Sequence, residues 1–478
     1  MSLLTKLPLV GGRPVASGKT RDITNPYNSA LVGAVDDATQ EIVLLAIAAA
    51  EEGARRMLTL TAHQRGDFLD GAAALLGRRA AEAASIICSE SGKPIRDARA
   101  EVARCMTTLK LSAEEARRIG GELLPLDAAP NGAGRTGITK RFPIGIVTAI
   151  TPFNFPLNLA AHKAGPALAS GNSIILKPAP RTPLSCFLLA EILLEAGCPP
   201  EAVSVVTGDP PVFDALITDP RIAMVSFTGG GAAGWNIKER APKKKVTLEL
   251  GGNAAAIVHT DADIKNAAAR CVAGSFTFAG QVCIRSQRIL IHNSVFDIFM
   301  KDFAERTRAL RTGDPAAETT DIGPMIDAAA AARAWSWVEE ARAAGAILVC
   351  GGPPAGAFLP PAILTNVPHG CRAYCEEIFA PVSVVDRYEN IGDAIAIVND
   401  SRFGLQAGIF TNSVDVLMRA FEQLRVGAVI HNDVPAFRAD LMPYGGVKDS
   451  GFGREGVRDA IREMTDVRLL ALRPDPKI

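Results

Sequence analysis

One cysteine, Cys283 in the stretch GQVCIRSQR, raises the question of whether a thiol acts as a nucleophile in this protein. A thiolate attacks electrophilic carbon and forms a covalent intermediate when its surroundings activate it. Most free cysteines, however, are buried and behave as small hydrophobic residues. The cysteine taken alone therefore leaves both interpretations open.

A glycine-rich turn, FTGGGAAG, supplies a second candidate site. Gly229, Gly231 and Gly234 match the dinucleotide fingerprint between an expected strand and an expected helix. The acidic residue that usually follows about twenty positions later would be Glu249, which would then bind a ribose. Because this turn does not follow the first strand of the expected sheet, it indicates a phosphate at a helix N-terminus rather than the usual geometry. Lys177, at the end of SIILK, is either a ribose or phosphate contact or an exposed strand-end lysine.

Alternating strand and helix patterns must position these residues. From Ile144 onward the expected strands are IGIVTAI, SIILK, AVSVVTG, IAMVSFTG and KKVTLELGG, separated by helical segments. This alternation predicts a mostly parallel sheet that is buried on both faces, with the amphipathic helices of 39–118 packed onto it. A second series, from NAAAIVHTDADIK through RILIH, AILVCGG and QAGIFTN, predicts a second lobe. The stretch LDAAPNGAGRTGITKRF predicts a hairpin or arm, and TDVRLLALR an exposed strand that pairs with the arm or with another subunit.

Composition narrows the classes of function. The 478 residues include 51 basic and 51 acidic side chains, so neither nucleic acid nor an anionic membrane is an implied partner. No sustained apolar segment or cleavage pattern occurs near the start, and we therefore expect a cytoplasmic protein. The nine cysteines lack paired spacing and the six histidines lack metal-binding spacing, so the sequence predicts reduced thiols and no metal site.

Several longer motifs resemble the aldehyde dehydrogenase superfamily in order, wording and spacing. They are TPFNFPLNLAAHKAGPALASGNSIILKPAP, VTLELGGN, GQVCIRSQR, EEIFAPV and MPYGGVKDSGFGREG. The resemblance covers nearly the whole chain, and Cys283 follows Glu249 by 34 residues, as that family's nucleophile follows its base. The stretch NDVPAFRADLMPYGGVKDSG is most similar to the lactaldehyde and phosphonoacetaldehyde dehydrogenase-like branch.

The resemblance implies a fold with two Rossmann-like parallel-sheet lobes, of class α/β, and a β oligomerisation arm. The expected NAD(P)-binding domain comprises residues 1–118 and 141–248, and the expected catalytic domain comprises residues 249–445. Residues 119–140 and 446–478 would form the arm and the C-terminal strand. An arm and an exposed strand need edges to cover, so we expect a homodimer or homotetramer.

The resemblance also assigns catalytic roles. Cys283 would be the nucleophile, Glu249 the general base for hydrolysis of a thioester, and Asn154 an oxyanion donor together with the Cys283 backbone N–H. Glu455 would assist proton relay. The ribose-binding interpretation of Glu249 is thereby replaced, and we expect nearby N–H donors to favour the Cys283 thiolate.

The implied cofactor is NADP or NAD. Lys177 and Glu377 would contact ribose, Phe379 would lie against the nicotinamide, and Gly230 replaces a serine common beside the pyrophosphate. Many NAD-preferring relatives carry a glutamate three residues after the lysine, where this chain has Pro180 followed by Arg181, so we expect NADP to be accepted and hypothesise that it is preferred. The full expected cofactor site is Thr151, Pro152, Phe153, Lys177, Pro180, Arg181, Gly208, Phe227, Thr228, Gly229, Gly230, Leu250, Glu377 and Phe379.

Four basic residues are candidates for the substrate pocket: Arg104, His162, Arg285 and Arg438. A cationic pocket would favour a small hydroxylated or anionic aldehyde, whereas arginines that bridge domains or subunits would say nothing of the substrate. The predicted function is NAD(P)-dependent oxidation of such an aldehyde to its carboxylic acid. The alternatives are a coenzyme A-acylating enzyme and an inactive, cofactor-binding structural protein.

Overall fold

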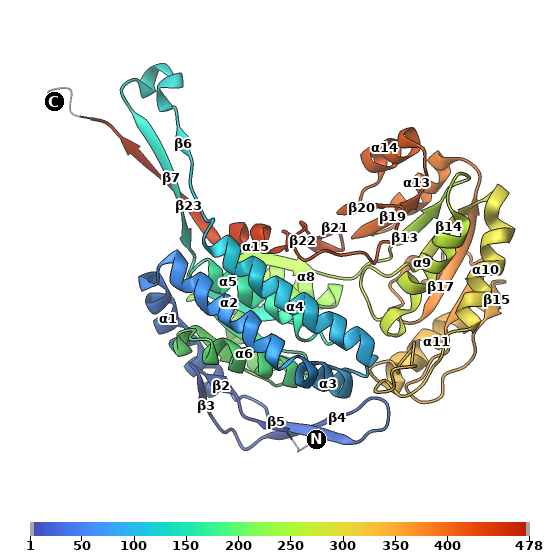
Figure 1. Cartoon of the computed structure of the whole chain (residues 1–478), viewed down its shortest axis with the longest axis horizontal. Helices are drawn as coiled ribbons and strands as arrows, with labels where there is room; N and C mark the ends of the chain where they lie inside the picture. Colours follow the sequence, from blue (N-terminus) through green and yellow to red (C-terminus); the bar gives the residue numbers. More distant parts are fainter. Residues whose placement is uncertain (1–3, 475–478) are drawn as a thin grey trace.

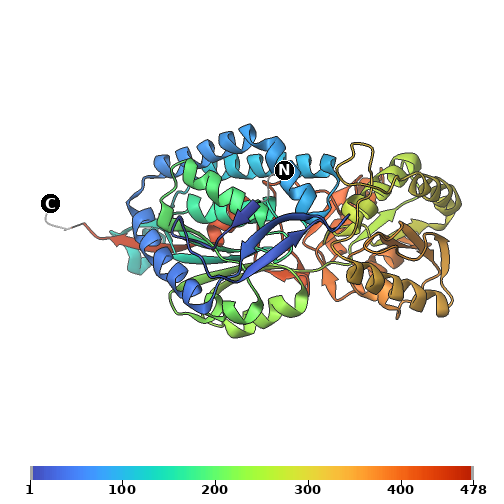
Figure 2. The same ribbon diagram turned by 90° about the horizontal axis from the view of Figure 1, so that it is seen from below.

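The computed structural model describes residues 4–474 and consists of two α/β domains and a projecting arm (Figure 1). Residues 1–3 and 475–478, at the outer ends of the expected cofactor domain and C-terminal strand, lie outside the described residues. The two parallel-sheet lobes and the β arm predicted from the sequence are confirmed. Figure 2 shows the two domains side by side, with the arm leaving the first domain on the side away from the second.

The sheet of the first domain is built on parallel strands that alternate with helices. Its strand order is β22-β12-β11-β8-β9-β10-β2-β3, with β22, β2 and β3 antiparallel to their neighbours. The strands are β2 (Leu9–Val10), β3 (Arg13–Pro14), β8 (Ile146–Ile150), β9 (Ser173–Lys177), β10 (Val203–Val205), β11 (Ile222–Thr228), β12 (Lys245–Glu249) and β22 (Gly451–Phe452). Lys177 and Glu249 therefore lie at the carboxyl ends of β9 and β12, at the same end of one sheet, where open α/β sheets bind ligands.

Both faces of this sheet are covered, because successive side chains of a strand point to opposite faces. Val147, Leu176 and Met224 pack into one core with the helices α2 (Ala62–Arg78), α3 (Ala80–Ser91), α4 (Ile95–Ala116), α5 (Asn158–Ala169), α6 (Leu184–Glu195) and α15 (Val457–Glu463). Ile175 and Val225 pack into a second core with α1 (Gln40–Thr59), α7 (Asp214–Thr218) and α8 (Gly231–Arg240). A small sheet of β1 (Leu4–Lys6), β5 (Leu31–Asp36) and β4 (Thr20–Thr24) flanks this domain.

The second domain repeats the scheme with strand order β15-β16-β17-β14-β13-β19-β20. Its strands are β13 (Ala255–Val258), β14 (Arg288–His292), β15 (Ile347–Cys350), β16 (Ala362–Thr365), β17 (Val382–Tyr388), β19 (Gln406–Phe410) and β20 (Ala428–His431). Helices α9 (Ile264–Phe276), α10 (Phe296–Arg308), α11 (Ala328–Ala343) and α12 (Arg372–Cys375) pack on one face. Helices α13 (Ile391–Asn399) and α14 (Val414–Gln423) pack on the other.

The arm is a sheet in the order β23-β7-β6, formed by β6 (Leu123–Leu124), β7 (Thr136–Pro143) and β23 (Thr465–Leu472). The C-terminal strand thus pairs with the arm of its own chain along its whole length, from Thr465 opposite Pro143 to Leu472 opposite Thr136. Short 3₁₀ turns, η1 (Leu126–Ala128) and η2 (Pro130–Gly132), form its tip.

The segment that precedes β23 does not lie in the arm sheet, although the sequence grouped residues 446–478 together. β21 (Val447–Lys448) pairs with β18 (Phe403–Gly404), whereas β22 adds to the free edge of β12. Val457 and Ile461 of α15 are buried in the first domain's core. The chain therefore returns from the second domain to complete the first before it enters the arm.

Candidate active site

A cavity of about 420 Å³ lies at the carboxyl end of the first sheet, between the two domains. Most of the residues predicted from the sequence meet on its walls. They are Arg104, Thr151, Pro152, Phe153, Asn154, Lys177, Pro180, Phe227, Thr228, Gly229, Gly230, Glu249, Leu250, Cys283, Glu377, Phe379 and Arg438. Glu455, Arg181, Gly208, His162 and Arg285 are not among the wall residues.

The Cys283 thiol lies next to a tyrosine that also lines the cavity. Its Sγ lies 3.2 Å from the Tyr444 hydroxyl. Burial raises the pKa of this thiol to about 12, and the carboxylates of Glu377 and Glu249 add to the rise. The Tyr444 hydrogen bond opposes the shift without cancelling it. The expectation that N–H donors favour the thiolate is therefore wrong for this environment, and the thiol needs a base to ionise.

The backbone before Cys283 is forced into an unusual path. In η5 (Thr277–Gly280), Phe278, Ala279 and Gly280 all have positive φ, of 50°, 51° and 66°. A Cβ on Gly280 would stand 2.3 Å from the Ala380 carbonyl oxygen, so only glycine fits there. Such conformations cost free energy and persist where the surrounding structure imposes them.

Glu249 ends β12 inside the cavity with its carboxylate free. The residue is 2% exposed, and neither carboxylate oxygen has a hydrogen-bond partner within residues 4–474. Burial raises its pKa well above the usual range, and the neighbouring Glu455 carboxylate adds to this rise. A buried, unpaired carboxylate with a raised pKa is a strong base for its class and is typical of catalytic sites.

Two glycines after Glu249 allow the other groups to approach. A Cβ on Gly251 would lie 2.3 Å from Glu377 Oε2, and one on Gly252 would lie 2.4 Å from the Cys283 carbonyl oxygen. The Gly252 N–H donates to Glu377 Oε1 at 2.9 Å. The LGG sequence thus brings the strand end, the cysteine loop and Glu377 together.

Asn154 lies in the loop between β8 and α5 with its amide pinned in place. Its Nδ2 donates to the Gln281 carbonyl at 2.9 Å, while Oδ1 has no partner in the described part of the chain. Because a side-chain amide has two N–H donors, the second remains for a ligand at the cavity wall. The loop itself is anchored by Glu101, whose Oε1 accepts the N–H groups of Leu157 and Asn158.

Glu455 lies behind the cavity in a buried charged cluster. Lys163 Nζ donates to Glu455 Oε1 at 2.5 Å and to Ser226 Oγ at 3.0 Å. Arg438 Nη2 lies 3.4 Å from Glu455 Oε2, and its guanidinium stacks 3.7 Å from the Tyr444 ring centroid. Burial raises the pKa of Glu455, but the charges of Lys163 and Arg438 outweigh it and lower the pKa to about 2. This cluster carries one net positive charge next to Glu249.

The other end of the cavity fits a nicotinamide dinucleotide. Helix α8 begins after Gly230, where an added Cβ would meet nothing within 4 Å, so open space lies over the helix N-terminus. The buried hydroxyls of Thr151 and Thr228 have no partner among the described residues. Burial lowers the pKa of Lys177 to about 8 and raises that of Glu377 to about 7. A bound dinucleotide would give these groups partners. The N-terminus of α8 would hold its phosphate, and Lys177 and Glu377 would hold its ribose.

Two expected cofactor residues lie off the wall. Arg181 Nη2 pairs with Asp327 Oδ2 at 3.0 Å, which links the β9–α6 connection to the N-cap of α11 in the second domain. Gly208 follows β10 with a φ of 141°, and a Cβ there would contact the Phe213 ring at 3.3 Å. The ring of Phe213 in turn lies 5.1 Å from Lys177 Nζ. Gly208 therefore shapes the surroundings of the lysine.

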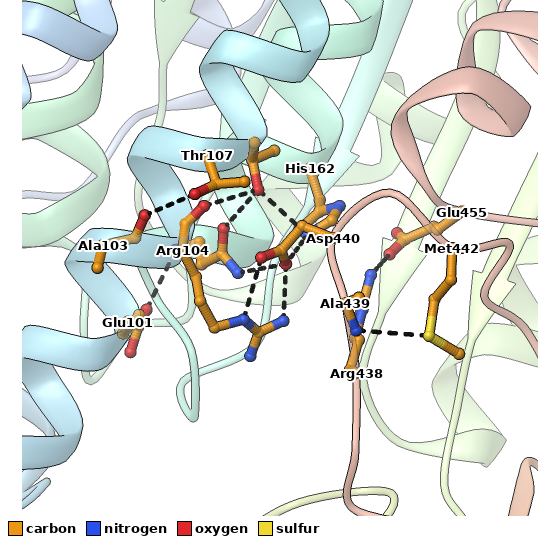
Figure 3. Close-up of polar contacts among 12 residues, drawn as sticks. Glu101, Ala103, Arg104, Thr107, His162, Arg438, Ala439, Asp440, Met442 and Glu455 are labelled. Atoms are coloured by element: carbon orange, nitrogen blue, oxygen red, sulfur yellow. Dashed lines mark hydrogen bonds and ion pairs between the residues drawn. The ribbon is translucent and has the colours of Figure 1, made fainter. Parts of the chain in front are cut away.

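The substrate candidates divide into two groups, and Figure 3 shows three of the four, Arg104, His162 and Arg438. Arg104 and Arg438 line the cavity, whereas His162 and Arg285 are buried beside it. Arg285 donates from Nη2 to Gln287 Oε1 at 3.0 Å, and burial lowers its pKa to about 9. His162 contacts Asp440, as Arg104 does. The two buried residues therefore support the site without forming its surface.

Several site residues were missed in the sequence. Tyr444 lies inside the motif MPYGG, yet no role was expected of it. Asn158 and Lys163 lie on α5, and only Asn158, four residues before His162, had helical spacing as an available signal. Asp440 carried no sequence signal, because its partner Arg104 is 336 residues away.

Comparison with known proteins agrees with this geometry. A model of the aldehyde dehydrogenase family matches residues 14–470. The 3-sulfolactaldehyde dehydrogenase of Priestia aryabhattai is 44% identical over 464 residues, which cover 97% of each chain. Aldehyde dehydrogenase 21 of Physcomitrella patens, in complex with the reaction product succinate, superposes with a TM-score of 0.97 at 40% identity and covers 100% of both chains. Glyceraldehyde-3-phosphate dehydrogenase of Methanocaldococcus jannaschii, complexed with NADP, gives 0.91 at 37% identity, covering 95% of this chain and 99% of that one.

Proposed function

The chain belongs to the aldehyde dehydrogenase family, and we propose from this premise that it oxidises a small anionic or hydroxylated aldehyde to its carboxylic acid. The cofactor of the family is NAD or NADP. The observation that carries the proposal is the meeting of Cys283, Glu249 and Asn154 with two arginines on the walls of one cavity.

The first step is attack of the Cys283 sulfur on the aldehyde carbon. Because burial disfavours the thiolate, the thiol must lose its proton to a base, and Glu249 is the buried carboxylate with free oxygens. The aldehyde oxygen becomes an oxyanion, which accepts the second N–H of the Asn154 amide. The bond between Asn154 and the Gln281 carbonyl fixes that amide before the substrate arrives.

NAD(P), when bound, supplies a hydride acceptor for the substrate carbon, which leaves the acyl group on Cys283 as a thioester. Lys177 and Glu377 would hold ribose, and the open N-terminus of α8 after Gly230 would hold the pyrophosphate. The rings of Phe153 and Phe379 meet edge to face at 5.9 Å, and they would exclude water from that end of the cavity.

Hydrolysis completes the reaction. Glu249 first releases to solvent the proton it took from the thiol, and then takes a proton from the water that attacks the thioester. As the carbon–sulfur bond breaks, that proton passes to the departing sulfur, which restores the Cys283 thiol and frees the carboxylic acid. The neighbouring Glu455 carboxylate disfavours the ionised form of Glu249, whereas the positive charges of Lys163 and Arg438 favour it. A free carboxylate at this position favours water over coenzyme A as the acyl acceptor.

Arg104 and Arg438 select the substrate by its charge. The aldehyde named for the Priestia relative and the succinate bound by the Physcomitrella relative both carry an anionic group distant from the reacting carbon. An arginine fork matches sulfonate and carboxylate oxygens. We therefore expect an anionic or hydroxylated chain end to bind at these two residues.

The test is the initial rate of cofactor reduction with sulfolactaldehyde, lactaldehyde, succinic semialdehyde, phosphonoacetaldehyde and benzaldehyde, each with NAD and NADP. We expect kcat/KM for the best anionic or hydroxylated aldehyde to exceed that for benzaldehyde by at least about tenfold. Since Pro180 leaves no carboxylate to repel a 2′-phosphate, NADP should be used at least as well as NAD. A preference for benzaldehyde would make both arginines structural, and no turnover would favour a cofactor-binding structural protein.

The arm is proposed to join copies of this chain. Strand β23 has an unpaired outer edge, and Val467, Leu469, Leu470 and Leu472 on its two faces are exposed. Exposed apolar edge strands are usually covered by a partner. Within the described residues, no helix has the length and apolarity to cross a bilayer.

Replacing Leu469 and Leu470 together by lysine is expected to shift the protein to a smaller species in light scattering. Charges on both faces of β23 would oppose burial of the strand. The replacement Arg473→Ser, at the polar end of the same arm, serves as the control and should leave the mass unchanged. An unaltered mass for the lysine variant would rule out assembly through β23.

A further inference from the structure

Asp440 is a buried carboxylate at the edge of the cavity, on the connection between β20 and β21. It is 6% exposed and is surrounded by donors from two helices of the other domain (Figure 3). Its Oδ1 accepts from Arg104 Nη2 at 2.7 Å, from His162 Nε2 at 2.8 Å and from Asn158 Nδ2 at 3.3 Å. Its Oδ2 accepts from Arg104 Nε at 3.2 Å. Both oxygens are therefore engaged, and Arg104 is held at two points.

The charge states of this group are well defined. Burial raises the pKa of Asp440, but the hydrogen bonds of His162 and Arg104 outweigh it and hold the pKa well below its usual range. Burial and the charge of Arg438 lower the pKa of His162 to about 4, so its ring is neutral and donates through Nε2 at neutral pH. Arg104 and Asp440 thus form a pair with no net charge, and the uncharged imidazole of His162 donates a hydrogen bond to it.

The grip on Arg104 leaves one side of its guanidinium free. Nε and Nη2 face Asp440, and Nη1 makes no hydrogen bond in the described part of the chain. The guanidinium carbon lies 5.8 Å from the Phe155 ring centroid, and the side chain, 30% exposed, borders the cavity. An unrestrained arginine would lose rotamer entropy when it bound a substrate, and a restrained one has lost it beforehand.

We propose that Asp440 is a positioning residue for substrate selection, which holds the Arg104 fork so that its free edge meets the anionic end of the aldehyde. The inference rests on the proposed function and adds to it the residue that sets the direction of the arginine. His162 and Asn158 act through Asp440, by fixing the carboxylate that fixes the guanidinium.

Two effects of Asp440 oppose each other, which makes the proposal testable. Its negative charge weakens the attraction of Arg104 for an anion, whereas its hydrogen bonds orient the fork. The replacement Asp440→Asn keeps the shape and removes the charge. One acceptor oxygen becomes an NH₂ donor, which cannot accept the hydrogen bond of Arg104 or of His162. A role in orientation predicts weaker binding of anions in this variant, whereas a role in charge balance alone predicts tighter binding.

The experiment measures kcat and KM of the full-length protein for succinic semialdehyde and for butyraldehyde, a neutral aldehyde with the same number of carbons. In Asp440→Asn, the ratio of kcat/KM for the anionic over the neutral aldehyde should fall by about tenfold, chiefly through KM. The replacement Asp433→Asn is the matched control. Asp433 lies on the same connection as Asp440 and pairs with Arg270 of α9 at the surface, so its replacement should leave the ratio unchanged. An unchanged or higher ratio in Asp440→Asn would overturn the proposal.

A double-mutant cycle separates positioning from general destabilisation. In an Arg104→Ala background, Asp440→Asn should lower the ratio no further, since the guanidinium through which it acts is gone. A further fall of similar size would show that Asp440 acts without Arg104 and would refute the inference.

Arg104→Lys keeps the folded surroundings of Asp440 and the positive charge but lacks the fork, so it serves if Asp440→Asn does not fold. It should lower the ratio by a similar factor, and a wild-type ratio would exclude an oriented fork. Wild-type protein that turned over neither aldehyde would instead contradict the proposed function.

Discussion

Replacing Cys283 by alanine is expected to reduce kcat/KM for the preferred aldehyde by at least about 10⁴-fold. The variant has no atom that can form the thioester, while the cofactor end of the cavity, at Lys177 and Gly230, is untouched. Steady-state rates measure the loss, and quenching of protein fluorescence by NADPH measures cofactor binding, which should persist.

Cys350→Ala is the control for loss of a thiol, since Cys350 lies in β15 at the far edge of the second sheet. It should retain wild-type turnover. Cys283→Ala protein that kept more than a tenth of the activity would show that the reaction needs no covalent intermediate.

Replacing Glu249 by glutamine is expected to lower kcat by about 10²- to 10⁴-fold, which is the usual contribution of a general base. The amide has nearly the same shape but cannot take a proton from the Cys283 thiol or from water. Glu249→Asp, which restores a carboxylate on a shorter side chain, should recover part of the rate. A rate for Glu249→Gln within threefold of wild type would remove Glu249 from the mechanism.

The pH dependence follows from the same residue. Burial raises the pKa of Glu249, so its acid form persists to higher pH than that of an exposed carboxylate. The base form grows as the pH rises through this raised pKa, and kcat should rise with it. The rising limb should be present in the wild type and in Glu249→Asp and absent in Glu249→Gln.

The family and the α/β architecture were predictable from the sequence and are confirmed. Long motifs such as VTLELGGN and GQVCIRSQR carry their spacing with them, and buried parallel strands are readable as β-branched runs. The return of residues 451–463 to the first domain was not readable, since a two-residue edge strand has too little pattern to assign.

For the site, sequence motifs identified Cys283, Glu249 and Asn154, which do lie on the walls of one cavity. The motifs did not predict the pKa shifts of Cys283 and Glu249. The high pKa of the Cys283 thiol arises from burial by residues distant in the chain, which no local pattern encodes. The same limit explains Arg104, whose partner Asp440 could not be paired with it from spacing. Arg285, two residues from Cys283, is buried and lies off the cavity wall.

The late return of the chain to the first domain has a consequence for biosynthesis. Strand β12 ends at Glu249, but the strand that covers its outer edge, β22, ends at Phe452. During translation, about two hundred residues are added between these points. The outer edge of β12 therefore stays unpaired while the second domain is synthesised. A ribosome that stalls within this interval would release a chain with an open, apolar sheet edge, which is the kind of surface that chaperones must shield.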